Sequence, residues 1–167
     1  MYDKLTQKDI GRLEEEIEHR KLVLRPELLE DVKETRAQGD LSENFEYYAA
    51  KREKNKNESR IRFLERMIRT AEIISDDSQE DEVGIDKTVT VEFVEDKSIE
   101  VYKIVTTVRG NSLEGLISNG SPLGKALLGS RVGDTVHVQV NDSYGYDVKI
   151  IKIENTADDG LEKIRSF

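Results

Sequence analysis

The sequence predicts an α+β protein of two domains, an N-terminal antiparallel coiled-coil hairpin of α-helices followed by a small β-sheet domain with one short helix. Apolar residues recur at helical spacing through the first half of the chain. Short runs of alternating, β-branched residues fill the second half. An acidic run without periodicity, residues 76–82, separates the halves and is typical of a domain boundary. We therefore expect the hairpin over residues 1–75, a linker over 76–84 and the sheet domain over 85–167.

The first long helix is expected to begin after Thr6, a residue type favoured at a helix N-cap. Its apolar stripe consists of Leu5, Ile10, Leu13, Ile17 and Leu24. Pro26 interrupts this pattern, so it should kink the helix or reset its first turn. Gly39 predicts the end of the helix, because glycine readily adopts the left-handed conformation that follows a last helical turn.

A second helix is expected to start at once, with Asp40 as its cap. Its apolar face consists of Phe45, Ala49, Ile61, Leu64, Ile68, Ala71 and Ile74. A connection this short forces the two helices antiparallel, and about 32 residues in each would give a hairpin roughly 48 Å long. Residues 51–58 are polar on every face, so we expect the apolar seam to thin towards the turn.

Five β-branched runs predict the strands of the second domain. They cover residues 88–94, 100–106, 113–117, 135–140 and 146–153. Residues 141–145 have the composition of a hairpin turn. Residues 122–128 should form the short helix, because Pro122 suits a first helical turn.

Composition and charge narrow the class of protein. The net charge of −9 argues against a protein whose main task is to grip a nucleic-acid backbone, although residues 47–70 carry eight basic and only three acidic side chains. The absence of cysteine excludes disulfides and thiolate chemistry, and two distant histidines, His19 and His137, argue against a histidine metal site. Without a long apolar run or a signal-peptide pattern, we expect a cytoplasmic monomer with no membrane partner.

Three carboxylates mark the predicted turn of the hairpin. Asp40, Glu43 and Glu46 are spaced three apart, so they can share a face at the start of the second helix, and carboxylate oxygens suit Mg²⁺. A purely structural interpretation is also open, since Asp40 and Glu43 fit a capping box at the positive end of a helix. Two or three carboxylates are too few for a complete Mg²⁺ site. Metal chemistry here would need a second molecule, which favours an accessory factor over an enzyme.

Two long motifs identify a family resemblance. The first is Gly-Asp-Leu-Ser-Glu-Asn-Phe-Glu-Tyr at residues 39–47, which we call the tip, followed by Ala-Ala-Lys at 49–51. The second runs from Ile117-Ser118 through Ser-Pro-Leu-Gly-Lys-Ala-Leu-Leu-Gly at 121–129 to Gly-Asp-Thr-Val at 133–136. Both closely resemble the GreA/GreB transcript-cleavage factors. Arg25-Pro26 and Arg36 also stand where that family has them, and Leu41 resembles the GreA form of the tip.

The resemblance implies a coiled-coil hairpin and an FKBP-like C-terminal domain. In that family the C-terminal domain docks on bacterial RNA polymerase, and the hairpin carries its acidic tip through the secondary channel to the active site. There Asp40 and Glu43 would help the polymerase hold a second Mg²⁺, shared with its active site and not bound by the isolated protein. The outcome is cleavage of the backtracked transcript near its 3′ end, performed by the polymerase and stimulated by this protein.

The resemblance also assigns secondary roles around the tip and the docking loop. Candidate contacts to RNA are Lys51, Arg52, Lys54 and Lys56, for which a solvated helix face is the alternative. Candidate supports of the tip are Arg36, Ser42, Asn44 and Tyr47. Tyr47 and Phe45 could stack on a base or pack the tip, and packing is the expectation for Phe45. Candidate docking residues are Asn119, Ser121 and Pro122, with Gly120 where the family has an acidic or amide residue.

Three other functions stay open at this level. Some relatives enter the same channel and inhibit transcription, but intact Asp40 and Glu43 favour cleavage. A prolyl isomerase with a chaperone arm needs a pocket lined by aromatics, and the C-terminal half has no tryptophan and few other aromatics. A coiled-coil adaptor without chemistry at its tip would tolerate substitution of both carboxylates.

Overall fold

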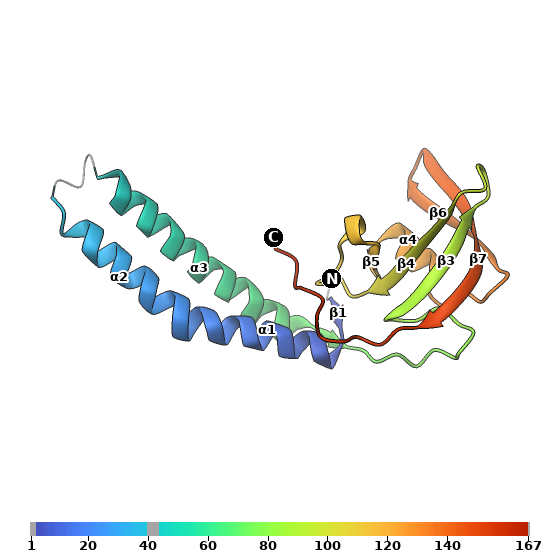
Figure 1. Ribbon diagram of the computed structural model, residues 1–167, viewed down its shortest axis with the longest axis horizontal. Helices are drawn as coiled ribbons and strands as arrows, with labels where there is room; N and C mark the ends of the chain where they lie inside the picture. The colour runs from blue at the N-terminus through green and yellow to red at the C-terminus, as the bar shows by residue number, and fades with distance from the viewer. Residues whose placement is uncertain (1–2, 40–43, 167) are drawn as a thin grey trace. The chain divides into compact units, whose positions relative to one another are not determined.

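The computed structural model describes residues 3–39 and 44–166. They form a helical unit and a sheet unit, which are treated separately (Figure 1). The helical unit includes Ile10–Ala71, and the sheet unit combines Lys4–Asp9 with Glu72–Phe167. The sheet unit is thus built from two separate pieces of chain. The α+β class of two domains, a helical hairpin and a sheet domain, is confirmed.

The first arm of the hairpin is helical from Gln7 to Arg36. It consists of α1 (Gln7–His19), a π-helical turn (Arg20–Leu24) and α2 (Arg25–Arg36). Thr6 caps α1 as expected, because its Oγ1 accepts a hydrogen bond from the backbone N–H of Asp9 at 3.2 Å. Pro26 resets the helix at the first turn of α2. Proline lacks an N–H and its ring crowds the carbonyl four residues earlier, which accounts for the wider turn just before it.

The second arm, α3 (Phe45–Thr70), begins later than the sequence predicts. Its N-cap is Asn44, so the expected cap at Asp40, and with it the capping box of Asp40 and Glu43, is wrong. Asn44 takes this role because its side chain accepts from the Tyr47 N–H at 2.9 Å and also donates to the carbonyl of Thr35 at 2.6 Å. The hydrogen bond of Asn44 to Thr35 on the other arm outweighs the local preference for a cap at Asp40.

The end of α3 also differs from the prediction. Ala71 is extended, and the chain continues as the short strand β2 (Glu72–Ile73). β2 pairs in parallel with β1 (Lys4–Leu5) inside the sheet unit. Ala71 and Ile74 therefore do not extend the apolar face of the helix, because the backbone of this segment pairs with residues 4 and 5.

The seam of the hairpin is apolar only in its base half. Buried residues of α3 include Ile61, Leu64 and Met67, whereas the described residues of the π-helical turn and α2 include none that is buried. The expected thinning of the seam is confirmed. Phe45 is 83% exposed, so its predicted place in the seam, and its expected packing role, are wrong. The facing part of α2 offers no buried apolar surface to receive its ring.

Ion pairs cross the seam where apolar contacts are fewer. Arg25 Nε lies 2.7 Å from Glu58 Oε1, and the paired Nη2–Oε2 contact makes this bridge bidentate. Arg60 Nε lies 2.8 Å from Glu16 Oε2 in the same way. The order of these pairs along the two arms confirms the antiparallel arrangement, which is visible for α2 and α3 in Figure 1.

The described part of the sheet unit forms a five-stranded mixed sheet of order β5-β4-β3-β7-β6. The strands are β3 (Lys87–Phe93), β4 (Ile99–Val105), β5 (Leu116–Ser118), β6 (Thr135–Asn141) and β7 (Tyr144–Asn155). Only the pairing of β4 with β5 is parallel within this sheet. The short helix α4 (Pro122–Leu127) lies where Pro122 predicts it.

The core of this unit lies between one face of the sheet and α4. Val89, Val91, Ile104 and Ile150 are buried there with Leu127 of the helix. One predicted strand is wrong in part, since residues 112–114 form a 3₁₀ turn before β5. Asn111 caps that turn and Gly115, at φ +74°, ends it, so Leu113 is left exposed.

Candidate functional site

The tip motif, residues 39–47, lies in the sequence between the end of α2 and the start of α3. Asp40 and Glu43, the predicted catalytic and metal-binding carboxylates, lie with Leu41 and Ser42 outside the described residues. Both ends of this segment are described. α2 ends in a cap at Ala37, and Asn44 bonds to Thr35 on one arm and to Tyr47 on the other. This amide clamp fixes the separation of the two chain ends from which the carboxylates extend.

The other predicted supports surround this clamp. Tyr47 is half-buried and meets the ring of Tyr48 edge to face, with centroids 5.4 Å apart. Arg36 is exposed on the last turn of α2, and Glu46 is exposed in the first turn of α3. Carboxylates near this end of α3 are favoured by the helix dipole.

The predicted RNA contacts lie along the tip half of α3. Lys51, Arg52 and Lys56 are exposed, whereas Lys54 is half-buried. Nearer the base, Arg60 is paired across the seam with Glu16 instead. The half of α3 nearest the tip thus presents positive charge to solvent, where it is available to an anion such as an RNA phosphate.

No group of three or more histidine, cysteine or acidic side chains among residues 3–39 and 44–166 has the arrangement of a metal site. In the sequence the tip offers three carboxylates, Asp40, Glu43 and Glu46. Such a set fits Mg²⁺ in the kind of atom but not in the number of ligands. A metal held here would need oxygen ligands from another molecule.

The predicted docking residues lie in the loop between β5 and α4. Ser121 caps α4, since its Oγ accepts from the Gly124 N–H at 3.0 Å and donates to the carbonyl of Ser118 at 2.7 Å. A side chain at Gly124 would approach that same carbonyl to 2.0 Å, so this position requires glycine. Asn119 is held by its backbone N–H, which donates to the Val105 carbonyl at 2.7 Å.

This loop borders a cavity of about 520 Å³. Ser121 and Pro122 form part of its wall, and the side chains of Leu116, Ile117 and Tyr146 supply much of the apolar surface. Leu113, exposed on the preceding turn, extends the apolar rim. The described lining contains one aromatic ring, Tyr146, so the aromatic cage expected of a prolyl isomerase is not present among these residues.

The structure adds a buried ionic cluster that the sequence does not indicate. The guanidinium of Arg109 is buried and donates to Asp9 at 2.7 Å, to Asp86 at 2.6 Å and to Glu162 at 2.8 Å. Burial opposes the charge, but the hydrogen bond to Asp86 and the nearby charge of Asp9 outweigh it and raise the pKa of Arg109 above its ordinary value. Its partners lie 23, 53 and 100 residues away, so no local pattern could reveal the cluster.

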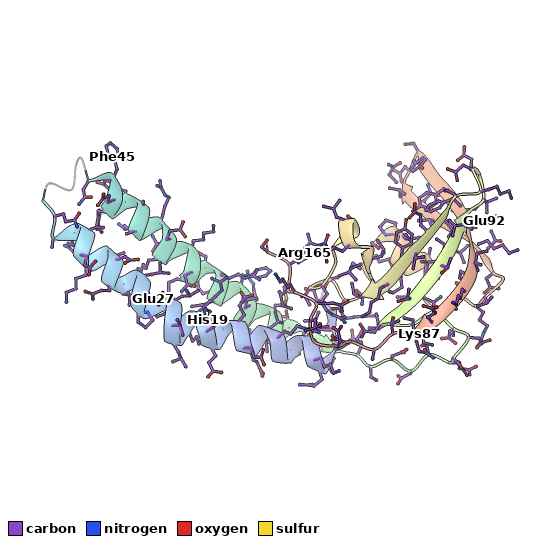
Figure 2. The ribbon with its side chains drawn as sticks, viewed as in Figure 1. His19, Glu27, Phe45, Lys87, Glu92 and Arg165 are labelled. Carbon is purple, nitrogen blue, oxygen red and sulfur yellow. The ribbon has the colours of Figure 1, made fainter. Side chains whose placement is uncertain are left out.

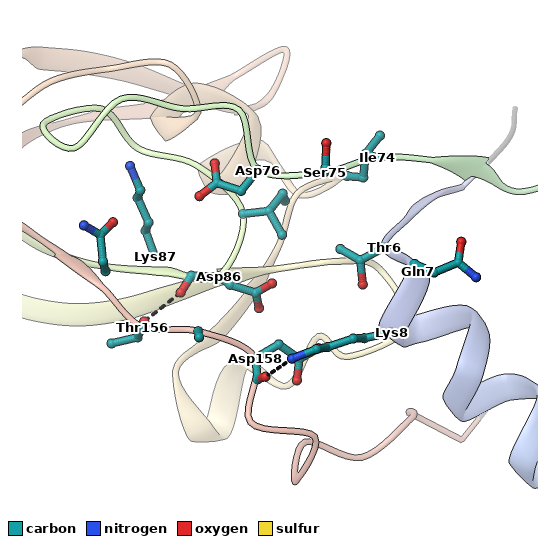
Figure 3. A pocket seen from close by; sticks show the side chains of 13 residues that line it. Thr6, Gln7, Lys8, Ile74, Ser75, Asp76, Asp86, Lys87, Thr156 and Asp158 are labelled. Atoms are coloured by element: carbon teal, nitrogen blue, oxygen red, sulfur yellow. Dashed lines mark hydrogen bonds between the residues drawn. The ribbon is translucent and has the colours of Figure 1, made fainter.

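A second cavity, of about 470 Å³, lies beside this cluster (Figure 3). At its wall Lys8 Nζ donates to the carbonyl of Asp158 at 2.8 Å, and Thr156 Oγ1 donates to that of Asp86 at 2.7 Å. These contacts join the C-terminal segment to residue 8 and to the start of the sheet. The cluster and its surroundings therefore serve the assembly of this unit.

Comparison with known proteins matches both halves of the chain to one family. Residues 4–73 match the family model "Transcription elongation factor, N-terminal", and residues 78–155 match "Transcription elongation factor, GreA/GreB, C-term". The transcription elongation factor GreA of Streptococcus pneumoniae serotype 19F (strain G54) is 46% identical over 154 residues, which covers 92% of this chain and 96% of the relative. GreA of Streptococcus sanguinis (strain SK36) is 46% identical over 153 residues, 91% and 95% of the two chains.

Among solved structures, GreA factor homolog 1 (Gfh1) of Thermus thermophilus is 27% identical, with 92% of this chain and 99% of that chain covered and a TM-score of 0.43. The sequence matches define the class as a two-domain accessory factor of transcription. The chain belongs to the GreA/GreB family of transcription elongation factors. Within the described residues no helix has the length and apolar character needed to cross a bilayer.

Proposed function

We propose that this GreA-like transcription elongation factor enters the secondary channel of RNA polymerase and stimulates cleavage of the backtracked transcript. The observation that carries the proposal is the amide clamp of Asn44, which joins the two arms of the hairpin on either side of Asp40 and Glu43 in the sequence. A hairpin end of two paired helices can enter a water-filled channel lined by another protein. It would carry Asp40 and Glu43 at its leading end.

At the polymerase active site the two carboxylates would complete a binding site that the polymerase begins. Mg²⁺ held there would activate a water molecule and stabilise the charge that develops on the phosphate. Asp40 and Glu43 would orient that water towards the phosphorus atom of the scissile phosphodiester. Attack breaks the bond to the 3′ oxygen and leaves a new RNA 3′ end for extension. The polymerase performs the reaction, and this chain supplies ligands to it.

The sheet unit would hold the factor on the polymerase through the loop at Ser121 and Pro122. The apolar cavity beside this loop supports that role, because it can receive an apolar side chain from the rim of the channel. Gly120 leaves the approach open, since it is exposed and carries no side chain. We propose that docking here depends on shape and apolar contact instead of on a charge at position 120.

The test is RNA cleavage in a stalled, backtracked elongation complex with Mg²⁺. Replacing both carboxylates, Asp40→Ala with Glu43→Ala, is expected to lower the cleavage rate by at least about a hundredfold, because it removes the ligands that this chain would supply to the Mg²⁺ and its water. Binding to polymerase, measured by competition with the native protein, should be unchanged. The matched control is Glu27→Ala with Glu30→Ala, an exposed pair of the same spacing on α2, which should cleave like the native protein.

The outcomes separate this proposal from its rivals. Equal cleavage by the native and tip variants would contradict a chemical role for Asp40 and Glu43 and favour an adaptor. Binding without cleavage by either protein, together with slower elongation, would establish an inhibitor of the channel. The isomerase is not favoured, because both halves of the chain match transcription elongation factors and the described cavity lining is poor in aromatics.

A further inference from the structure

An exposed stripe runs along the tip half of α3. It consists of Phe45, Tyr48, Arg52 and Lys56, which follow one another at intervals of three, four and four residues and therefore share one face of the helix. All four are exposed, Phe45 by 83% and Tyr48 by 47% of its surface. At the helical rise per residue the stripe is about 16 Å long. Figure 2 shows Phe45 projecting outward at the start of α3.

The position of Phe45 is fixed by its neighbours. It is the first residue of α3, directly after the Asn44 cap that bonds both arms of the hairpin. Its ring therefore extends from a point of the backbone that is anchored to both arms. A single exposed apolar side chain is ordinary on a protein surface. The order of the side chains along the stripe is unusual, because two aromatic rings at its start are followed by two cations.

We propose that Phe45 stacks on a base of the displaced 3′ segment of the transcript, the RNA that the family resemblance already brings to the cations of this helix. Tyr48 extends the stacking surface, and Arg52 and Lys56 neutralise phosphates behind it. Aromatic platforms for bases beside cations for the backbone are how proteins hold single-stranded RNA without reading its sequence. The inference rests on the proposed function for the presence of the RNA, and it names Phe45 as the residue that holds the base.

The distribution of charge favours RNA over the protein wall of the channel as the partner. The cations stand in line with the rings, whereas the nearby acids Glu46 and Glu53 are seven residues apart on a neighbouring face of the helix. An apolar contact with protein would favour further apolar side chains along the stripe. The stripe instead continues with Arg52 and Lys56.

The first test compares cleavage rates of Phe45 variants on two RNAs in assembled, backtracked complexes at limiting factor. Phe45→Leu keeps an apolar side chain but loses the aromatic face, so it should cleave roughly fivefold or more slowly, as Phe45→Ala does. Phe45→Tyr keeps the ring and should retain the native rate. On RNA whose displaced 3′ residues lack their bases, the native protein and Phe45→Leu should cleave equally. Tyr144→Ala, which removes an exposed ring of the sheet unit, is the matched control.

The second test does not depend on cleavage. A photoreactive 4-thiouridine at the RNA 3′ end is irradiated in complexes with the native protein and with the Asp40→Ala/Glu43→Ala variant. Cross-links in both proteins should map to residues 45–48. Cross-links there without any cleavage by the native protein would overturn the proposed function and support the stacking role of Phe45.

Two results would overturn the inference while leaving the proposed function in place. In the first, the native protein stimulates cleavage, the cross-links map outside residues 45–48, and Phe45→Leu does not change the cleavage rate. In the second, Phe45→Ala lowers the cleavage rate whereas Phe45→Leu keeps the native rate on both RNAs. That result would indicate an apolar contact of residue 45 with the polymerase. Failure of the native protein to bind polymerase would overturn the inference and the proposed function together.

Discussion

Asn57 is a buried amide within the seam of the hairpin, and its hydrogen bonds hold the widened turn before α2. Its side chain is 3% exposed, accepts from Arg20 Nη1 at 2.9 Å and donates to the Arg20 carbonyl at 3.3 Å. That carbonyl also accepts the backbone N–H of Arg25 across the π-helical turn. A polar side chain within an apolar seam is a known device for fixing the register of paired helices.

Asn57→Ala is expected to lower the free energy of unfolding by about 1–3 kcal/mol, because it removes both hydrogen bonds that the buried amide makes to Arg20 across the seam. Urea denaturation followed by the helical circular dichroism signal measures this loss. Asn55→Ala, an exposed amide two residues away, is the control and should have no effect. A loss no larger than that of the control would mean that water replaces the amide without cost.

His137 is expected to titrate above the ordinary range of a histidine. Its Nε2 is 2.7 Å from Gln139 Oε1 and its Nδ1 is 2.7 Å from Asp147 Oδ1, and these two hydrogen bonds raise the pKa of His137. A raised pKa in the folded state contributes stability that is complete below about 6.5, the unfolded value, and disappears as pH rises through the folded pKa. The contribution is small, because the ring is exposed.

An NMR titration of the His137 ring checks this shift. The midpoint should lie above about 6.5 in the native protein and fall towards that value in Gln139→Ala. A native midpoint at or below the ordinary value would show that neither hydrogen bond persists in solution.

At the scale of elements, most of the fold follows from local patterns. The spacing of Ile61 and Leu64 predicts the seam, and Pro122 predicts the start of α4. The errors fall where a distant or turn-forming contact competes. Asn44 moves the start of α3 because it bonds to Thr35 on the other arm, and the turn ended by Gly115 replaces part of a predicted strand. A local pattern contains no information about the contact of Asn44 with Thr35, whereas Asn111 and Gly115 are local turn signals that the alternating apolar residues outweighed in the prediction.

Some features of the candidate site can also be predicted from local sequence, whereas others depend on distant residues. The tip motif and the Ser121 cap are local and can be recognised in the sequence. The exposure of Phe45 could not be predicted, because it depends on what the opposite arm lacks. The cluster around Arg109 could not be predicted either, since Asp9 and Glu162 come from opposite ends of the chain.

The C-terminal segment is an element without regular structure that nevertheless supports the sheet. It lies beyond residue 155, where the family match ends. Glu162 lies 2.8 Å from Arg109 and 3.1 Å from Lys103, and the backbone N–H of Arg165 donates to the Val108 carbonyl at 2.8 Å. Removing these residues would deprive a buried guanidinium of two counter-charges, Glu162 and Asp158, the second of which lies 3.7 Å from Arg109.

A chain truncated after Asn155 is therefore expected to lose about 2 kcal/mol of stability in the sheet unit, and its Tm should fall by roughly 5 °C or more. Differential scanning calorimetry of the full chain and the truncated chain measures the change. Glu162→Gln should show part of the loss, whereas Leu161→Ser, at an 81% exposed position of the same segment, should show none. An unchanged Tm after truncation would mean that Arg109 is satisfied by Asp9 and Asp86 alone.

At the scale of the whole molecule, the folding units do not follow the order of the sequence. The family models divide the chain between residues 73 and 78, yet the sheet unit includes Lys4–Asp9. Leu5 is fully buried there, and Asp9 accepts hydrogen bonds from Arg109 and from Thr106 Oγ1 at 2.7 Å. A cut at the linker would therefore remove the strand that pairs with β2 and one counter-charge of the buried arginine.

A fragment of residues 72–167 should accordingly be less stable than the same unit in the intact chain. Joining residues 1–9 to that fragment through a flexible Gly-Ser linker should restore much of the difference, because it returns the β1 strand, the side chain of Leu5 and the carboxylate of Asp9. Urea denaturation of the two fragments compares their free energies of unfolding. The joined fragment with Asp9→Ala should recover a smaller free energy of unfolding, because it returns β1 and Leu5 but not the counter-charge of Arg109. Equal stability of the fragment with and without residues 1–9 would show that the sheet unit is complete from residue 72 onward, and that the buried arginine is satisfied without Asp9.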